Sequence, residues 1–227
     1  MFVADDLPLR RRTWLKLAAI PKSRLGWELE DCVDVAKDDM EVIKKWLSRA
    51  KSNNIIRAVG KNSCGLGLML YGSPGHGKTT LALALLQDII RDFSMENFAV
   101  NDGTTMARPC YFIQYSSLVE LRGEIMNDAT PDKLRLWEGV LGESKEDTYN
   151  IRVLVIDDIG KEHQSGSGWQ SSLLHHILRT RFNNGLPTIV TTNLKKWNTT
   201  YGEATDSFMH EAFVIVELQS PSGDLRK

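Results

Sequence analysis

Two kinds of hydrophobic pattern alternate along most of the chain. Short apolar runs typical of buried strands occur at 67–71, 110–115, 153–156, 187–191 and 213–218. Apolar residues at helical spacing occur at 35–51, 79–91, 116–127, 132–141 and 168–183, after a first short helix that should end by Pro21. Strands separated by helices predict an α/β fold in which helices cover both faces of a parallel sheet.

The first predicted strand leads into a glycine-rich turn. Its sequence, Gly72-Ser-Pro-Gly-His-Gly-Lys-Thr79, fits the pattern Gly-x-x-x-x-Gly-Lys-[Ser/Thr] and lies between a strand and a helix. Glycines let successive backbone N–H groups surround phosphates, and the start of the helix adds positive charge. We therefore predict a P-loop ATP site, in which Lys78 contacts the β and γ phosphates and the Thr79 hydroxyl binds Mg²⁺. The predicted phosphate-binding residues are Gly72, Ser73, Pro74, Gly75, His76, Gly77, Lys78, Thr79 and Thr80.

Polar side chains follow two later strands. Asp157 and Asp158 come directly after the apolar run Val153-Leu-Val-Ile156, and Asn193 follows the run at 187–191. In a parallel sheet these strand ends lie at the same edge as the phosphates. We predict that Asp157 binds Mg²⁺, that Asp158 is the general base for an attacking water, and that Asn193 orients this water or binds the γ phosphate.

Composition narrows the class of protein. The chain has 227 residues, enough for one domain with a small extension, and 28 basic against 29 acidic residues exclude a polybasic protein. An apolar fraction of 42% excludes a disordered chain. No apolar run reaches the roughly 18–20 residues of a membrane span, and the three widely spaced cysteines suggest neither disulfides nor a zinc site. We expect a cytoplasmic protein with no membrane partner and no metal besides Mg²⁺.

The first part of the chain is rich in basic residues. Residues 10–24 hold six basic side chains and no acidic one, which is consistent with a solvated helix face or with a contact to nucleic acid or a partner. We divide the chain into a helical N-terminal extension, 1–55, and an ATPase domain, 56–227. Trp14, Trp27 and Trp46 are expected to pack among the N-terminal helices. His175 and His176 are not a metal site, because adjacent helical residues point about 100° apart.

Several motifs together resemble the DnaC/IstB-type AAA+ ATPases, a group of helicase loaders and transposition helper ATPases. They are Tyr-Gly-Ser-Pro-Gly-His-Gly-Lys-Thr-Thr-Leu at 71–81, Leu-Val-Ile-Asp-Asp-Ile-Gly at 154–160, Asn-Gly-Leu-Pro-Thr-Ile-Val-Thr-Thr-Asn at 184–193, Leu-Ala-Ala-Ile-Pro at 17–21 and Tyr-Gly-Glu at 201–203. The resemblance implies ATP hydrolysis between subunits of a homo-oligomer, single-stranded DNA in its centre and a replicative helicase as partner. Ser167 and Trp169 match the family's DNA-contacting positions, although Trp169 is equally consistent with a core residue at a helix start.

The chain departs from this family in two ways. Loaders carry an N-terminal domain that grips the helicase, whereas about ten residues precede the matching segment here. The family also places an arginine after Tyr-Gly-Glu that reaches the neighbouring subunit's ATP, and Phe208 occupies the matching position. Arg179 and Arg181 are candidate replacements, with Arg181 the better match, and Arg226 resembles the family's C-terminal sensor 2 arginine. Two other functions stay open: a transposition helper that binds duplex DNA, and an ATP-bound module that sequesters a replication protein.

Overall fold

The computed structural model describes residues 7–32, 35–51, 56–59, 62–92, 98, 100, 104–160 and 168–219. The helices are α1 (Leu7–Leu17), α2 (Lys37–Lys51), α3 (Lys78–Asp92), α4 (Tyr115–Asn127), α5 (Pro131–Leu141), α6 (Trp169–Asn183), α7 (Asn198–Tyr201) and α8 (Glu203–Ala212). The strands are β1 (Ile56–Val59), β2 (Asn62–Gly65), β3 (Gly67–Tyr71), β4 (Cys110–Gln114), β5 (Val153–Ile159), β6 (Thr188–Thr192) and β7 (Phe213–Glu217). No helix in these ranges has the length and apolar character needed to cross a membrane.

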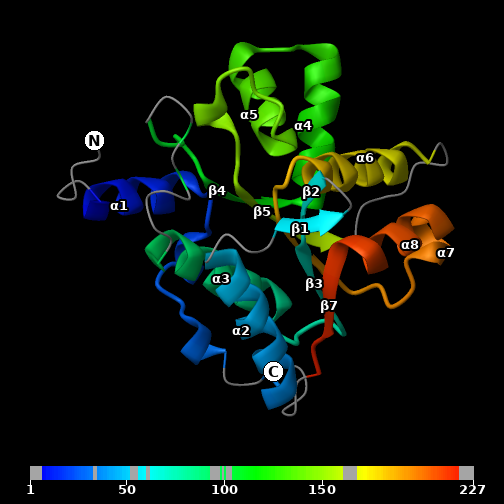
Figure 1. Ribbon diagram of the computed structural model, residues 1–227. Coiled ribbons are helices and arrows are strands. Elements are labelled where there is room, and N and C mark those ends of the chain that lie inside the picture. Colours follow the sequence, from blue (N-terminus) through cyan, green and yellow to red (C-terminus); the bar gives the residue numbers. More distant parts are fainter. Residues whose placement is uncertain are drawn as a thin grey trace.

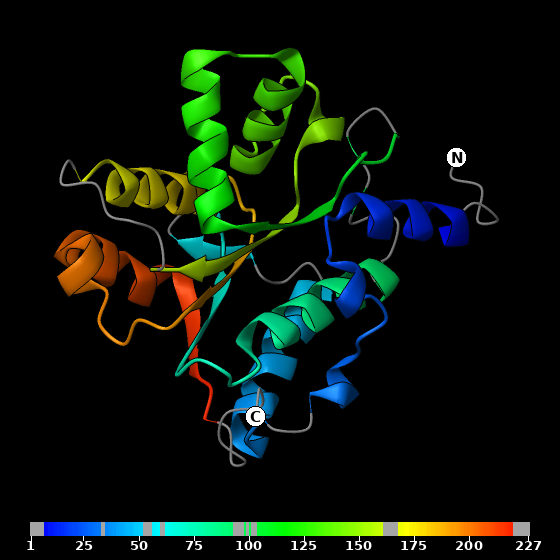
Figure 2. The same cartoon turned by 180° about the vertical axis from the view of Figure 1, so that it is seen from behind.

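A parallel sheet forms the centre of the fold. Its strands follow the order β4-β5-β6-β3-β7, and every neighbouring pair is parallel. Helices α1, α2 and α3 lie on one side of the sheet, and α4 to α8 lie on the other (Figures 1 and 2). The predicted α/β fold class and all five predicted sheet strands are confirmed.

Alternating strand residues build a separate hydrophobic core on each face. In β3, Leu68 and Leu70 join the core beneath α1, α2 and α3, whereas Met69 between them joins the core beneath α4 to α8. This is the two-residue periodicity of a strand that is buried on both faces. Strand β5 divides its apolar residues in the same way, so the sheet holds both helical layers together.

The N-terminal helices α1 and α2 pack on the same side of the sheet as α3 and share its hydrophobic core. Trp14 of α1 and Trp46 of α2 are buried in the same cluster as Leu70 and the apolar residues of α3. The indole of Trp14 donates a hydrogen bond of 3.0 Å to the carbonyl of Met106. The predicted packing role of these two tryptophans is confirmed.

Some elements were not predicted. Strands β1 and β2 form an antiparallel hairpin that pairs Ile56 with Gly65, but Asn62-Ser-Cys-Gly65 lacks the apolar alternation of a strand. Helices α7 and α8 are also additions, and α8 buries Phe208 and Met209 in the second core. Both helices are short, and their place is set by burial against α6 more than by any local signal.

Candidate nucleotide-binding site

The phosphate loop joins β3 to α3 at the carboxyl edge of the sheet. Gly72 has a φ of 147°, and a Cβ placed on it would lie 2.4 Å from the carbonyl oxygen of Leu218, so only glycine fits there. The segment after β7 fastens the loop, because Leu218 donates its N–H to the carbonyl of Tyr71 at 2.7 Å and His76 Nδ1 lies 2.9 Å from the Leu218 carbonyl. The loop is therefore held in place by the end of an adjacent strand.

Lys78 lies over this loop at the start of α3. Its side chain is only 6% exposed. The ammonium donates hydrogen bonds to the carbonyls of Gly72, at 3.0 Å, and Ser73, at 2.8 Å. These bonds hold a positive charge at the loop where a phosphate-binding lysine is expected.

The carboxylate of Asp157 connects three elements beside the loop. It is 2% exposed, and its Oδ1 accepts hydrogen bonds from the Thr79 hydroxyl at 2.8 Å and from the Thr191 hydroxyl at 2.5 Å. A threonine hydroxyl and a carboxylate are the hard oxygen ligands that Mg²⁺ prefers. The described residues contain no group of three or more His, Cys, Asp or Glu side chains arranged for a metal. Thr79 and Asp157 therefore fit Mg²⁺, which needs few protein ligands when phosphates complete its shell.

A β-bulge in β5 separates the two acidic side chains. The register between β5 and β6 shifts between Ile156 and Ile159, and Asp158 within it has a φ of 59°, rare for a non-glycine residue. The N–H of Asp158 donates to the Thr191 hydroxyl at 3.0 Å. The bulge keeps Asp157 buried against Thr79 while Asp158 lines the adjacent pocket.

This pocket has a volume of about 340 Å³. The predicted residues that line it are Gly75, His76, Gly77, Lys78, Thr79, Thr80, Asp158 and Asn193. The structure thus brings the loop, the predicted base and the predicted polar amide together at one cavity. Burial, followed by the charges of Asp31 and Glu30, raises the pKa of the Cys32 thiol in its wall to about 11.

The rest of the pocket wall was not anticipated from the sequence. It consists of Arg24, Trp27, Asp31, Cys32 and Val35, from the segment between α1 and α2. Trp27, expected to be a packing residue, is half-buried and lines the pocket, and the Arg24 guanidinium lies 5.0 Å from its ring centroid. No motif marks this segment, and only the proximity of an aromatic to basic residues at 22 and 24 hints at a binding role.

Arg181 does not have the role that the resemblance implied. Its side chain is 0% exposed, and burial lowers its pKa to about 9. The guanidinium donates to the Thr188 hydroxyl at 2.8 Å and to four backbone carbonyls, those of Val140, Ile151, Arg152 and Pro187. It cannot reach the ATP of a neighbouring subunit, because it is enclosed within its own chain. Arg181 is a structural cation that joins α6 to the segments around β5 and β6.

Arg179 lies two residues earlier on α6 and is exposed. Its guanidinium is 4.6 Å from the ring centroid of Phe208, and its Nε donates to His175 Nε2 at 3.3 Å. Phe208 itself is 1% exposed. Burial, then the charges of Arg179 and His176, lowers the pKa of His175 and favours the neutral ring that can accept this bond. Phe208, which occupies the position where the family carries an arginine, thus lies in the core. Arg179 of the neighbouring helix α6 lies over its ring.

The remaining predicted residues lie elsewhere. Trp169 begins α6, is half-buried and packs against the second core, so it is consistent with both interpretations proposed from the sequence. Ser167 and Arg226 lie outside the described residues. The exposed residue Gly168, with a φ of 64°, precedes Trp169 and turns the chain into the helix.

Sequence comparison places these features in a known family. Residues 68–199, more than half of the chain, match the family described as "ATPase family associated with various cellular activities (AAA)". The matched region begins in β3 and includes the phosphate loop, the two aspartates and Asn193. The chain therefore belongs to the AAA family. A comparison with curated protein sequences finds no significant match.

Solved structures share the fold. The DnaC helicase loader is 24% identical, with a TM-score of 0.60 over 88% of this chain and 100% of that one. DnaI is 20% identical, with a TM-score of 0.58 over 88% of this chain and 95% of that one. Domain III of the replication initiation protein DnaA from Thermotoga maritima is 14% identical, with a TM-score of 0.56 over 83% and 65%. At these identities the likeness concerns the fold.

Proposed function

We propose that the protein is a DNA replication factor similar to a helicase loader, which binds and hydrolyses ATP with Mg²⁺. It acts as a homo-oligomer, binds single-stranded DNA and contacts a replicative helicase. The observation that carries the ATPase part is the convergence of the phosphate loop, the Thr79–Asp157 pair, Asp158 and Asn193 at one sheet edge. The replication part is supported by the fold shared with the DnaC helicase loader, DnaI and the replication initiation protein DnaA.

Each residue of this site has a task in the proposed reaction. The loop N–H groups and Lys78 bind and neutralise the phosphates, and Thr79 and Asp157 hold Mg²⁺. A bound Mg²⁺ supplies positive charge beside the β and γ phosphates. Asp158 accepts a proton from the attacking water, and Asn193 orients that water or binds the γ phosphate. Arg179 is our candidate for the arginine that completes a neighbouring site.

The proposed DNA contact centres on Trp169, together with Ser167. An aromatic ring at the start of a helix offers a stacking surface for a base, and such contacts contribute about 1–3 kcal/mol per base. Trp169 is half-buried, so the residue is partly accessible to solvent. We expect ATP to promote assembly, and assembly to bring several such rings to one strand.

Fluorescence anisotropy with labelled single-stranded and duplex oligonucleotides tests the proposal. The protein is titrated with and without ATP and Mg²⁺, beside Lys78→Ala and the control Lys44→Ala, which changes an exposed lysine of α2. We expect ATP-dependent preference for the single strand in the wild type and Lys44→Ala, and its loss in Lys78→Ala. Unchanged assembly and DNA affinity in Lys78→Ala would contradict the proposal.

Other outcomes point to the other functions. Preference for duplex DNA indicates a transposition helper. Tight ATP binding without turnover, even with DNA present, indicates a module that sequesters a replication protein. The buried Phe208 at the arginine position favours this last alternative over the helper, provided that Arg179 does not act between subunits.

A further inference from the structure

The nucleotide pocket has two walls of different chemistry. The phosphate loop provides backbone N–H groups and Lys78 on one side. The segment between α1 and α2 adds an indole, an aliphatic side chain, a thiol, a carboxylate and a guanidinium, from Trp27, Val35, Cys32, Asp31 and Arg24. A triphosphate needs the first wall only. The second has the aromatic and apolar surface that suits a nucleobase.

The second wall has little regular structure of its own. Between α1 and α2 the residues that the structure describes form two 3₁₀ helices, Lys22–Arg24 and Leu29–Asp31, and Trp27 lies in the irregular stretch between them. Gly26 before it has a φ of 84°. Such a segment needs contacts from outside itself to hold an aromatic ring in one place.

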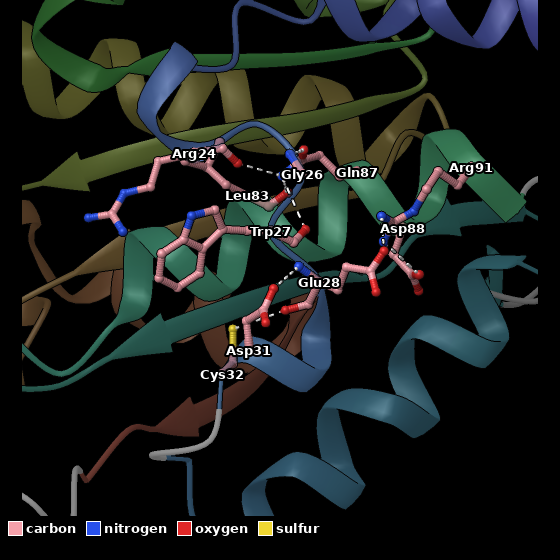
Figure 3. Close-up of polar contacts among 10 residues, drawn as sticks. All are labelled: Arg24, Gly26, Trp27, Glu28, Asp31, Cys32, Leu83, Gln87, Asp88 and Arg91. Carbon is pink, nitrogen blue, oxygen red and sulfur yellow. Dashed lines mark hydrogen bonds and ion pairs between the residues drawn. The ribbon is translucent and has the colours of Figure 1, made fainter.

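Gln87 of α3 supplies these contacts (Figure 3). Its side chain is 2% exposed. The carboxamide oxygen accepts the N–H of Gly26 at 2.8 Å, and the nitrogen donates to the carbonyls of Arg24, at 3.0 Å, and Trp27, at 3.4 Å. The same nitrogen lies 3.2 Å from the Leu83 carbonyl of its own helix. One buried amide thus binds three consecutive parts of the wall segment, about 60 residues away in sequence.

The Gln87 carboxamide suits this position because its oxygen accepts a hydrogen bond and its nitrogen donates hydrogen bonds. A glutamate would place acceptors against carbonyls, and an apolar residue would leave the Gly26 N–H and two carbonyls without this partner. A packing role alone would not need these groups. The side chains of Arg24 and Trp27 extend together away from Gln87, on the side opposite Asp88 and Arg91 (Figure 3).

We propose that Gln87 is a positioning residue for nucleobase binding, which holds Trp27 as the stacking surface for the base. The inference rests on the proposed ATP binding and adds to it the part of the protein that contacts the base. A stacked aromatic contributes more affinity when its position is fixed in advance, because less conformational freedom is lost on binding. Gln87 therefore acts on the base through Trp27 and leaves the phosphate loop unchanged.

Comparing two ligands separates the two walls. MgATP has a base and phosphates, whereas magnesium tripolyphosphate has phosphates alone, and calorimetry measures both affinities for each variant. Gln87→Met keeps length and helix propensity but removes the amide. We expect its ATP affinity to fall about tenfold, as for the loss of one stacked base, and its tripolyphosphate affinity to change less than about twofold.

Further variants make the result specific. Trp27→Leu should reproduce the loss, and the double variant Trp27→Leu/Gln87→Met should lose no more than Trp27→Leu alone, because both act through one contact. Gly26→Ala strains the wall at an exposed position with a φ of 84° and changes no residue of α3, so it gives the same comparison if Gln87→Met does not fold. Arg91→Gln removes the partly exposed 2.7 Å ion pair to Glu28 on the same segment and should change neither affinity.

The outcomes distinguish the positioning role of Gln87 from the proposed ATP binding. Equal losses for both ligands in a folded Gln87→Met protein, or additive losses in the double variant, would overturn the positioning role. If wild-type protein binds both ligands equally well, the wall does not contact a base. The positioning role then fails, while the proposed ATP binding stands. Wild-type protein that binds neither ligand would remove the proposed ATP binding itself.

Discussion

The hydroxyl of Thr79 donates a 2.8 Å hydrogen bond to Oδ1 of Asp157, which joins the start of α3 to the end of β5. Two residues 78 positions apart therefore place their oxygen atoms side by side at the phosphate loop. Neither element contributes both of the proposed ligands, so the proposed Mg²⁺ site depends on the packing of α3 against the sheet. The Thr191 hydroxyl from β6 also donates to the same oxygen.

Asp157→Asn tests this pair as an Mg²⁺ site. The change keeps the shape of the side chain but removes its charge, so we expect the gain in ATP affinity on adding Mg²⁺ to fall about tenfold or more. Affinity measured in EDTA should stay the same. Fluorescent-nucleotide titrations with and without Mg²⁺ give both values. Asp132→Asn, at an exposed carboxylate of α5, is the control, and a loss of affinity that is equal in EDTA would rule out the metal role.

Arg179→Ala tests the arginine that lies over Phe208. Because its guanidinium is exposed and held by the Phe208 ring and His175, we expect ATP turnover to fall about 10³-fold, as for loss of an arginine finger, with ATP affinity unchanged. Arg135→Ala is a matched control, since Arg135 is also exposed and stacks on a ring, that of Tyr149, at 4.7 Å.

Mixing subunits shows whether Arg179 acts on a neighbour. Arg179→Ala subunits keep an intact pocket, and Asp158→Asn subunits lack the proposed base but keep the arginine and the ATP binding that assembly needs, so a mixture should regain turnover that neither variant has alone. Steady-state ATPase assays at a fixed total concentration measure it. A mixture as inactive as its components would place Arg179 outside the reaction.

The parts of the site that could be predicted from sequence are those with local signals. The phosphate loop follows from glycine spacing, and Asp157, Asp158 and Asn193 each follow an apolar strand. Trp27 could not be assigned, because its place depends on Gln87, 60 residues away. The burial of Arg181 could not be predicted either, since its carbonyl partners at 140 and 151 come from distant segments. Local spacing locates the phosphate loop and the polar strand ends, and tertiary contacts decide what surrounds them.

Arg181→Met tests the structural role of the buried cation. The substitution leaves four carbonyls without their donor, and we expect the free energy of unfolding to fall by about 3 kcal/mol or more. Urea denaturation followed by circular dichroism measures it. Arg179→Met, on the exposed side of the same helix, should cost less than about 1 kcal/mol. Similar losses in the two variants would contradict the assignment of Arg181 as a structural residue.

The thiol of Cys32 offers a test of the pocket wall by pH. Burial, then Asp31 and Glu30, raises its pKa from 9.0 to about 11, and the thiolate is the form that reacts with iodoacetamide. At pH 7.5 the thiolate fraction is therefore about a hundredfold lower than for an unperturbed thiol. We expect slow alkylation that rises about tenfold per pH unit up to pH 10, measured by mass spectrometry of the Cys32 peptide.

Ligands should change this rate in a way that depends on which wall they cover. Cys32 lines the pocket beside Trp27, so MgATP should slow its alkylation, whereas magnesium tripolyphosphate should not. The comparison is made at pH 9, where the reaction is fast enough to follow and the fold is checked by circular dichroism. Alkylation at pH 7.5 as fast as that of a free thiol would contradict the burial of Cys32. Equal protection of Cys32 by both ligands would mean that phosphate binding alone shields the thiol.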